Sequence, residues 1–162
     1  MTTRAAVTGD AAAIATIWNR YIRDTAVTFT SEEKTAAGIA ADIAARQGGG
    51  MAFLVTGPAG RLAGFATSHP FRAGPGYQHT LEVTVMLAPE ARGQGRGRAL
   101  LAGLERAARG GGIHVLVAGI SGENPAACDF FAAAGFSPAG RIAQAGRKFG
   151  RWMDLVVMQK TL

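Results

Sequence analysis

The sequence lacks the features that mark secreted and membrane proteins. Cys128 is the single cysteine among 162 residues, so a disulfide framework within the chain is excluded. No apolar run approaches the roughly 18 residues of a membrane-spanning helix, and no basic segment followed by a long apolar core opens the chain. We therefore expect a soluble cytoplasmic protein, folded as one domain over residues 1–162.

Acidic residues are scarce relative to basic ones, 11 against 17, which leaves a net charge of +6. Such a chain attracts nucleic acid, an anionic surface or a small anionic ligand. The basic residues gather at 92–109 and 141–151 and form no face interleaved with aromatic residues. Because the first cluster lies in a glycine-rich segment, we expect a small phosphorylated ligand, with no nucleic acid, membrane or metal partner.

Strand and helix patterns alternate along the chain. Short apolar runs predict strands at 3–7, 51–56, 62–69, 77–87, 113–120 and 155–158. Apolar spacing and capping residues predict helices from Gly9-Asp10 through Ile22, from Ser31 to the glycines at 48–50, over 95–109, and from Asn124-Pro125 to Gly135. The turn at 57–61 predicts antiparallel pairing of its flanking strands. Residues 24–29 are interpreted as a connection with strand character, and residues 141–152 as a basic, glycine-rich segment.

The stretch 82–97, EVTVMLAPEARGQGRG, carries the strongest functional signal. An apolar strand ends at Pro89, and a glycine and arginine turn then leads into a helix. Glycines let backbone N–H groups approach an anion, the helix N-terminus adds partial positive charge, and arginines supply charge-assisted hydrogen bonds. The pattern R-x-x-G-x-G at Arg92–Gly97 is neither a P-loop nor a Rossmann fingerprint, and it favours a pyrophosphate ligand.

This strand and turn resemble the acetyl-CoA signature of the GCN5-related N-acetyltransferases (GNAT). Further segments resemble the phosphinothricin and methionine sulfoximine acetyltransferase subgroup: Phe71-Arg72, Tyr77–Glu82, Asn124–Ala126, Gly135-Phe136 and Gly146–Asp154. The resemblance implies an α/β GNAT fold, with a mixed, mostly antiparallel central sheet flanked by helices and a splay between strands 4 and 5. It also implies a homodimer with acceptor sites near the interface, which Phe149 and Trp152 would suit.

The resemblance further implies acetyl-CoA as co-substrate, held by the backbone of the signature strand and by the turn and helix that follow. The implied contacts are Val85, Met86, Leu87, Arg92, Gly93, Gln94, Gly95, Arg96, Gly97 and Asn124. Transfer to an amine is then direct, without a covalent enzyme intermediate. Cys128 is accordingly interpreted as a packing residue and not as a nucleophile.

Glu82 is the candidate general base, because a protonated amine must lose a proton before it attacks. A carboxylate in an apolar strand is paired, exposed at an edge or functional, so a surface salt bridge is the alternative. His79 is a second candidate base. Strand alternation places His79 on the face opposite Glu82 and Thr80 on the same face as Glu82.

An amino-acid-like acceptor carries a carboxylate and calls for fixed cations. Residues of the resembling segments supply the acceptor candidates: Phe29, Arg72, Tyr77, Thr80, Lys148 and Trp152. Solvated charges and core aromatics are the alternative for each of them.

One residue departs from the resemblance. The family carries a histidine or tyrosine at the position of Phe131, and phenylalanine cannot protonate the departing thiolate. We predict an N-acetyltransferase for a small amino-acid analogue such as phosphinothricin, methionine sulfoximine or methionine sulfone. The alternatives are an acetyltransferase for peptide N-termini or polyamines, and a non-catalytic acyl-CoA sensor.

Overall fold

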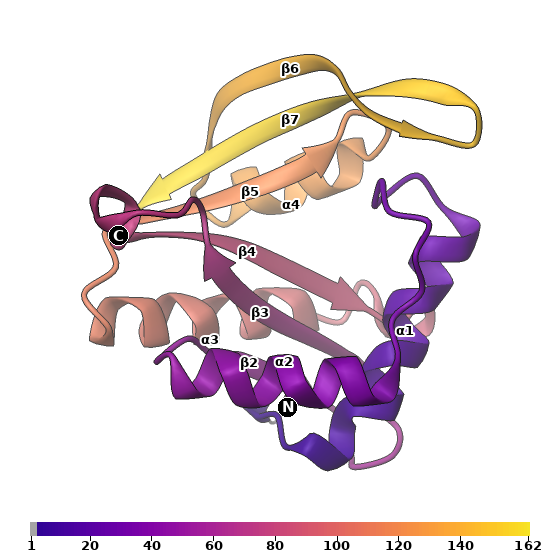
Figure 1. Ribbon diagram of the computed structural model, residues 1–162, viewed down its shortest axis with the longest axis vertical. Helices are drawn as coiled ribbons and strands as arrows, with labels where there is room; N and C mark the ends of the chain where they lie inside the picture. The colour runs from indigo at the N-terminus through magenta and orange to yellow at the C-terminus, as the bar shows by residue number, and fades with distance from the viewer. Residues whose placement is uncertain (1–2) are drawn as a thin grey trace.

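The computed structural model describes residues 3–162, which form one seven-stranded sheet with helices on both faces. The strands are β1 (Thr3–Ala5), β2 (Phe53–Thr56), β3 (Gly64–Pro70), β4 (Thr80–Leu87), β5 (Val115–Ser121), β6 (Ser137–Lys148) and β7 (Arg151–Thr161). Their spatial order is β1-β2-β3-β4-β5-β7-β6 (Figure 1). Only β4 and β5 pair in parallel, so the expected mixed, mostly antiparallel sheet is confirmed.

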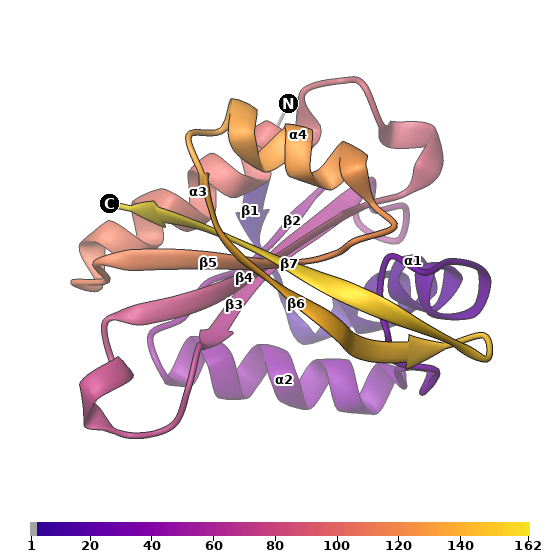
Figure 2. The same cartoon turned by 90° about the horizontal axis from the view of Figure 1, so that it is seen from above.

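Two pairs of helices enclose this sheet and build a core on each face. The helices are α1 (Ala11–Asp24), α2 (Ala36–Gly48), α3 (Arg96–Gly110) and α4 (Pro125–Ala133), with short 3-10 turns η1 (Thr8–Asp10), η2 (Pro75–Tyr77) and η3 (Pro89–Ala91). Figure 2 shows α1 and α2 on one face and α3 and α4 on the other. Ile14 and Ile39 pack with Phe65 on the first face, and Leu100 packs with Leu116 on the second. None of the helices in residues 3–162 is long and apolar enough to cross a membrane.

The sheet opens between its two central strands. Pairing of β4 with β5 covers Thr80–Glu82 opposite Val115–Val117 and then stops. Beyond that point β4 continues beside β3 as far as Leu87, while β5 continues beside β7 as far as Ser121. The expected splay is therefore confirmed, and it leaves the edge of β4 that faces β5 without a strand partner beyond Glu82.

The segment between α1 and α2 differs from the prediction. The second helix begins at Ala36, not near Ser31, because the side chain of Thr35 caps it by accepting from the N–H of Gly38 at 3.0 Å. The preceding chain is held out of helical conformation by Asn19, whose side-chain amide donates to the Lys34 carbonyl (2.8 Å) and accepts from the Lys34 N–H (2.7 Å). The strand character expected at residues 24–29 was also wrong, since Asp24 ends α1 and the residues after it form bends and irregular structure.

The prediction differs most from the structure in the C-terminal hairpin of β6 and β7. Residues 141–152 lie mostly in β6 and β7, and β7 is much longer than the predicted strand at 155–158. The strand pattern is hidden because β6 is exposed over nearly its whole length and its register with β7 shifts between Pro138 and Gly140 and between Ile142 and Gly146. The strand predicted at 77–87 begins at Thr80, and Tyr77 belongs to η2.

Asp10 ties the first strand to the first helix. Its carboxylate accepts from the Arg4 guanidinium at 2.7 and 2.8 Å and from the Val7 N–H at 2.9 Å, while the residue is only 3% exposed. The hydrogen bond from Arg4 is the main cause that lowers the pKa of Asp10 below its ordinary value of 3.8. The side chain therefore closes a turn before α1 and makes no capping bond to the helix N–H groups.

This ion pair predicts an acid-dependent loss of stability. A depressed folded-state pKa means that the stabilisation is fully present above the ordinary value and is lost as pH falls through the folded value. We expect Asp10→Asn to lower the free energy of unfolding at pH 7, and the difference from the wild type to shrink below about pH 4. Urea unfolding from pH 7 to pH 3 measures both. A difference that does not vary with pH would rule out the ion pair as its source.

Candidate active site

The opening between β4 and β5 holds two adjoining cavities, which share Val85, Met86, Asn124 and Phe131 as walls. The inner cavity, about 240 Å³, extends past Glu82, Gly119 and Ser121. The outer cavity, about 400 Å³, extends to Arg92, Gly93 and Gly97 of the glycine turn. The strand splay thus joins the predicted anion-binding turn to the predicted base in one continuous slot.

The glycine turn is shaped in advance for close approach to its backbone. Gly93 and Gly95 have φ values of 71° and 73°, which glycine adopts at little cost, and Gly95 is the N-cap of α3. Arg92 donates to the Tyr21 hydroxyl at 2.7 Å and lies over the Tyr21 ring. Tyr21 in turn donates to the Leu87 carbonyl at 2.6 Å, so the turn is fastened both to α1 and to the end of β4.

The turn also carries side chains outside the slot. Gln94 donates to the Glu90 carbonyl at 3.1 Å and accepts from the Arg96 guanidinium at 3.0 Å. Neither side chain lines either cavity. On the opposite wall, Asn124 caps α4 by accepting from the Ala127 N–H at 3.3 Å, as expected for the residue that opens this helix.

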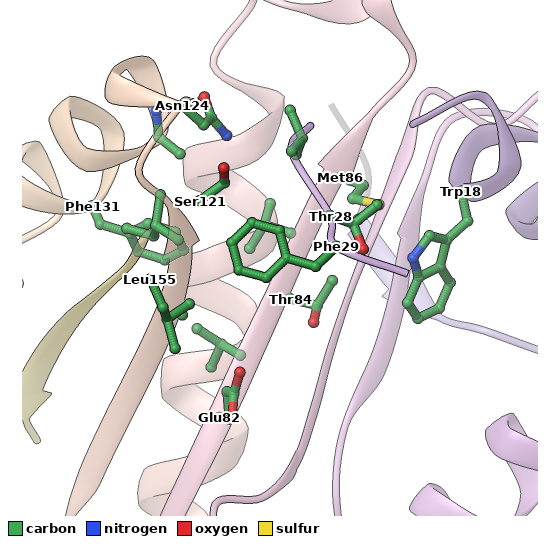
Figure 3. A pocket seen from close by; sticks show the side chains of 16 residues that line it. Trp18, Thr28, Phe29, Glu82, Thr84, Met86, Ser121, Asn124, Phe131 and Leu155 are labelled. Atoms are coloured by element: carbon green, nitrogen blue, oxygen red, sulfur yellow. Dashed lines mark hydrogen bonds between the residues drawn. The ribbon is translucent and has the colours of Figure 1, made fainter. Parts of the chain in front are cut away.

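Glu82 lies at the inner end of the slot, at the last position where β4 pairs with β5 (Figure 3). One of its carboxylate oxygens is 3.0 Å from the point where a Cβ on Gly119 would lie, so a side chain at that position would crowd the carboxylate. Within residues 3–162 no cation or side-chain donor pairs with Glu82. Among these residues Glu82 therefore has no ion-pair partner, and the salt-bridge alternative does not apply to this carboxylate.

A short loop covers the inner cavity and is held in place from the C-terminal hairpin. Val27, Thr28 and Phe29 line the cavity. Lys148 donates to the carbonyls of Thr25 (2.7 Å) and Thr28 (2.8 Å), and it is only 6% exposed. Burial lowers the pKa of Lys148. Its ammonium group thus fastens the loop, and Lys148 does not line the cavity.

The Phe29 ring packs directly on the backbone of Gly146 in β6. A Cβ at Gly146 would overlap this ring, so the space for the loop depends on glycine at that position. The start of the resembling segment Gly146–Asp154 therefore supports the loop that carries Phe29 along the inner cavity.

Several acceptor candidates lie away from the inner cavity of this chain. Tyr77 and Thr80 line a separate cavity of about 350 Å³ beside α3. Arg72 is exposed in the loop between β3 and η2, and Trp152 is 59% exposed beneath the Arg147 guanidinium. The second candidate base, His79, contacts the Gly112 carbonyl and Gln78, and it lines neither cavity of the slot.

Other lining residues were not identified from the sequence. Trp18, Thr84, Ser121 and Leu155 all face the inner cavity (Figure 3). Thr84 could have been found, since it follows Glu82 by two residues and strand alternation places both on one face. Trp18 and Leu155 had no such signal, because their patterns are those of ordinary core positions. Cys128 packs against the second core and is not in the slot, which agrees with its interpretation as a packing residue.

A splayed parallel pair joined to a glycine turn is the arrangement that the sequence resemblance implied. Residues 3–157 match the family described as the acetyltransferase (GNAT) domain. The chain belongs to the GNAT acetyltransferases. It is therefore an N-acetyltransferase by family, as predicted.

The GNAT relatives include members of the subgroup that the sequence resembled. An L-methionine sulfoximine/L-methionine sulfone acetyltransferase of Salmonella typhimurium is 37% identical, covering 100% of this chain and 95% of the relative. A phosphinothricin N-acetyltransferase of Alcaligenes faecalis is 36% identical, covering 94% and 78%. A solved acetyltransferase from Salmonella typhimurium, determined with its cofactor acetyl-CoA, has a TM-score of 0.95 at 37% identity, covering 100% and 94%.

Proposed function

We propose that this chain transfers the acetyl group of acetyl-CoA directly to the amino group of a small amino-acid analogue of the phosphinothricin, methionine sulfoximine or methionine sulfone type. Glu82 is the general base. The observation that carries the proposal is an unpaired carboxylate at the inner end of a slot whose outer end is the Arg92–Gly97 turn. The names of the relatives support the class of acceptor.

The residues of the slot fit acetyl-CoA. Gly93 and Gly97 line the outer cavity, where backbone N–H groups and the start of α3 suit a pyrophosphate, and Arg92 adds charge. The free edge of β4 at Val85, Met86 and Leu87 suits the amides of an extended arm. Gln94, Gly95 and Arg96 complete the turn at its rim, and Asn124 lines the wall shared by both cavities. When bound, acetyl-CoA supplies an activated acyl group.

Glu82 would accept the proton that the amine must lose before attack, either directly or through one water. Among residues 3–162, the inner cavity has one acidic lining residue and no basic one. A polyamine, with several positive charges, would favour more acidic residues, so the lining supports a small acceptor with a single amine. A non-catalytic sensor is the second candidate, because Phe131 cannot act as an acid, but a sensor needs no carboxylate at this place.

The remaining acceptor contacts are proposed to come from the rim and from a second copy of the chain. Ile142, Phe149 and Trp152 on the β6–β7 hairpin are 55%, 53% and 59% exposed, which supports burial against a partner. In a homodimer, Arg72, Tyr77, Thr80 and Trp152 could then contact the acceptor, with Phe29 against its side chain and Lys148 supporting the loop. Measuring the mass of the protein in solution distinguishes a dimer from a monomer.

We also propose that the protein is located in the cytoplasm.

A panel of amines tests the acceptor class. CoA release is followed with methionine sulfoximine, phosphinothricin, common amino acids, a peptide N-terminus and spermidine. The proposal expects turnover with the sulfoximine or phosphinothricin above all others. Preference for the peptide or for spermidine would move the function to that alternative, and tight acetyl-CoA binding without turnover on any amine would leave the sensor.

Arg92 provides a separate test of the cofactor half of the slot. We expect Arg92→Ala to weaken acetyl-CoA binding about tenfold, since it removes a charge-assisted contact and releases Tyr21. Calorimetric titration measures the affinity. The control Arg109→Ala removes the same charge from the exposed last turn of α3 and is expected to have little effect. A change in acceptor preference instead of cofactor affinity would show that this turn was assigned to the wrong ligand.

A further inference from the structure

Position 131 carries phenylalanine where the family resemblance implied a histidine or tyrosine. This residue therefore cannot protonate the sulfur of CoA when it leaves the acetyl group. It packs edge-on between Phe130 and Phe136, at ring-centroid distances of 5.1 and 5.0 Å, and offers no polar atom to the slot. Asn124 is the N-cap of α4. That cap uses the side-chain oxygen of Asn124 as an acceptor, so its amide is one possible donor at the wall shared by the two cavities. Among the hydroxyls that line the inner cavity, those of Thr28 and Thr84 belong to half-buried residues, and that of Ser121 belongs to a buried one.

Ser121 ends β5 and is only 3% exposed, although its side chain borders the cavity. Its hydroxyl oxygen accepts from the N–H of Glu123 at 3.2 Å, which fixes the oxygen. Among residues 3–162 no group accepts the proton of this hydroxyl. The site therefore presents a buried, positioned donor with one free O–H.

The strand geometry places this donor on the same face as Glu82. The Cβ direction of Gly119 points at a Glu82 oxygen, and Ser121, two residues later, projects from the same face of β5. Along a strand, two residues advance about 7 Å. Ser121 therefore lies about 7 Å along β5 from the position whose Cβ would meet the Glu82 carboxylate.

The order of Glu82, Ser121 and the glycine turn along the slot indicates which end takes the amine and which end takes the sulfur. β4 and β5 run in parallel from Glu82 and Val117 toward the glycine turn, so Ser121 lies on the turn side of Glu82. In Figure 3, Ser121 lies between Glu82 and Asn124. A donor molecule anchored at the turn has its sulfur on the turn side of the reacting carbon, and its amine acceptor on the Glu82 side.

We propose that Ser121 is a catalytic residue that donates a hydrogen bond to the sulfur as it leaves. The inference rests on the proposed function. The amine nitrogen uses its lone pair to form a bond to the acetyl carbon, and the proton that it loses goes to Glu82. The C–S bond breaks, and its electron pair goes to sulfur. Ser121 keeps its own proton, and water protonates the thiolate on release. A hydrogen bond to a charged acceptor is stronger than one to a neutral group, so it stabilises the sulfur of the leaving thiolate more than the sulfur of the bound thioester.

The test measures the thiol of bound CoA, which does not require turnover. The ultraviolet absorbance of the thiolate is titrated with pH in the complex of CoA with the wild type, Ser121→Ala and Ser68→Ala. Ser68 is the matched control, because it is also 3% exposed but lies on β3 beside the separate cavity. We expect Ser121→Ala to raise the pKa of the bound thiol by about one unit, a tenfold change, and Ser68→Ala to leave it unchanged.

Kinetics provide the second measurement. Ser121→Ala is expected to lower kcat roughly tenfold with the KM for acetyl-CoA nearly constant, and Ser121→Thr to restore part of the rate. An unchanged thiol pKa in Ser121→Ala, or an equal change in Ser68→Ala, overturns the assignment of Ser121. If the wild type turns over no amine, the proposed function fails instead, and the CoA titration still reports on the hydroxyl.

Discussion

Glu82→Gln is expected to lower kcat/KM for the amine by about a hundredfold or more at pH 7, while acetyl-CoA binds as before. The size follows from the usual contribution of a positioned general base. The substitution is nearly isosteric and leaves the strand pairing of Glu82 with His69 and Val117 intact. Because no described cation pairs with the carboxylate, its loss breaks no ion pair, and the defect reports on proton transfer.

The pH dependence is the sharper part of this prediction. The α-amino group of the acceptor is mostly protonated at pH 7, so the unprotonated fraction increases as pH rises through the pKa of this amine, and the need for a base declines. The rate of Glu82→Gln should therefore recover toward that of the wild type above this pKa. Initial rates from pH 6 to pH 10 measure it. Glu33→Gln removes a carboxylate that pairs with Arg23 and lines neither cavity of the slot, and it serves as the control for charge. A constant ratio of the two rates at every pH would dismiss Glu82 as the base.

Lys148→Met is expected to have the second largest effect, on both stability and the acceptor. Two loop carbonyls lose a charged donor, which costs on the order of 2 kcal/mol. The loop that carries Thr28 and Phe29 then loses its fastening to β6, so we expect the KM for the amine to increase about tenfold with little change for acetyl-CoA. Denaturant unfolding and steady-state kinetics measure the two effects.

Lys160→Met is the matched control for this variant. Lys160 also lies in the hairpin and also makes two bonds, to Glu105 and to the Ala134 carbonyl, each at 2.8 Å, but it lies at the opposite end of the sheet from the loop. The Lys160→Met variant should be less stable than the wild type, with an unchanged KM for the amine. If both variants change that KM equally, or if Lys148→Met changes only stability, Lys148 does not position the acceptor loop.

The fold was predictable where one face of an element is buried. The stripes of α1 and α3 and the continuous apolar run of β5 gave the right elements, because burial dictates their residues. β6 escaped detection since it pairs along one edge and buries almost no side chain, so its sequence carries no alternation. The start of α2 was misjudged because Asn19, distant in the sequence, holds the preceding backbone extended.

The site was predictable in the same uneven way. The glycine turn and Glu82 lie close together in the sequence, and their residue types alone predict an anion-binding turn and a candidate base. The contacts of Lys148 with the loop could not be predicted from the sequence. They require the loop at Thr25–Thr28 to meet β6, and these residues are more than a hundred positions apart in the sequence. Ser121 was missed for a related reason: its importance depends on the direction of the splay and on the absence of an acid at Phe131.

Mass analysis of the product tests the central claim most directly. The wild type is incubated with methionine sulfoximine or phosphinothricin and with acetyl-CoA labelled in its acetyl group. We expect the label to appear on the α-amino nitrogen of the acceptor, with one CoA released for each acetylated amine. CoA release that does not depend on either amine, or binding of acetyl-CoA without any labelled amide, would contradict the account.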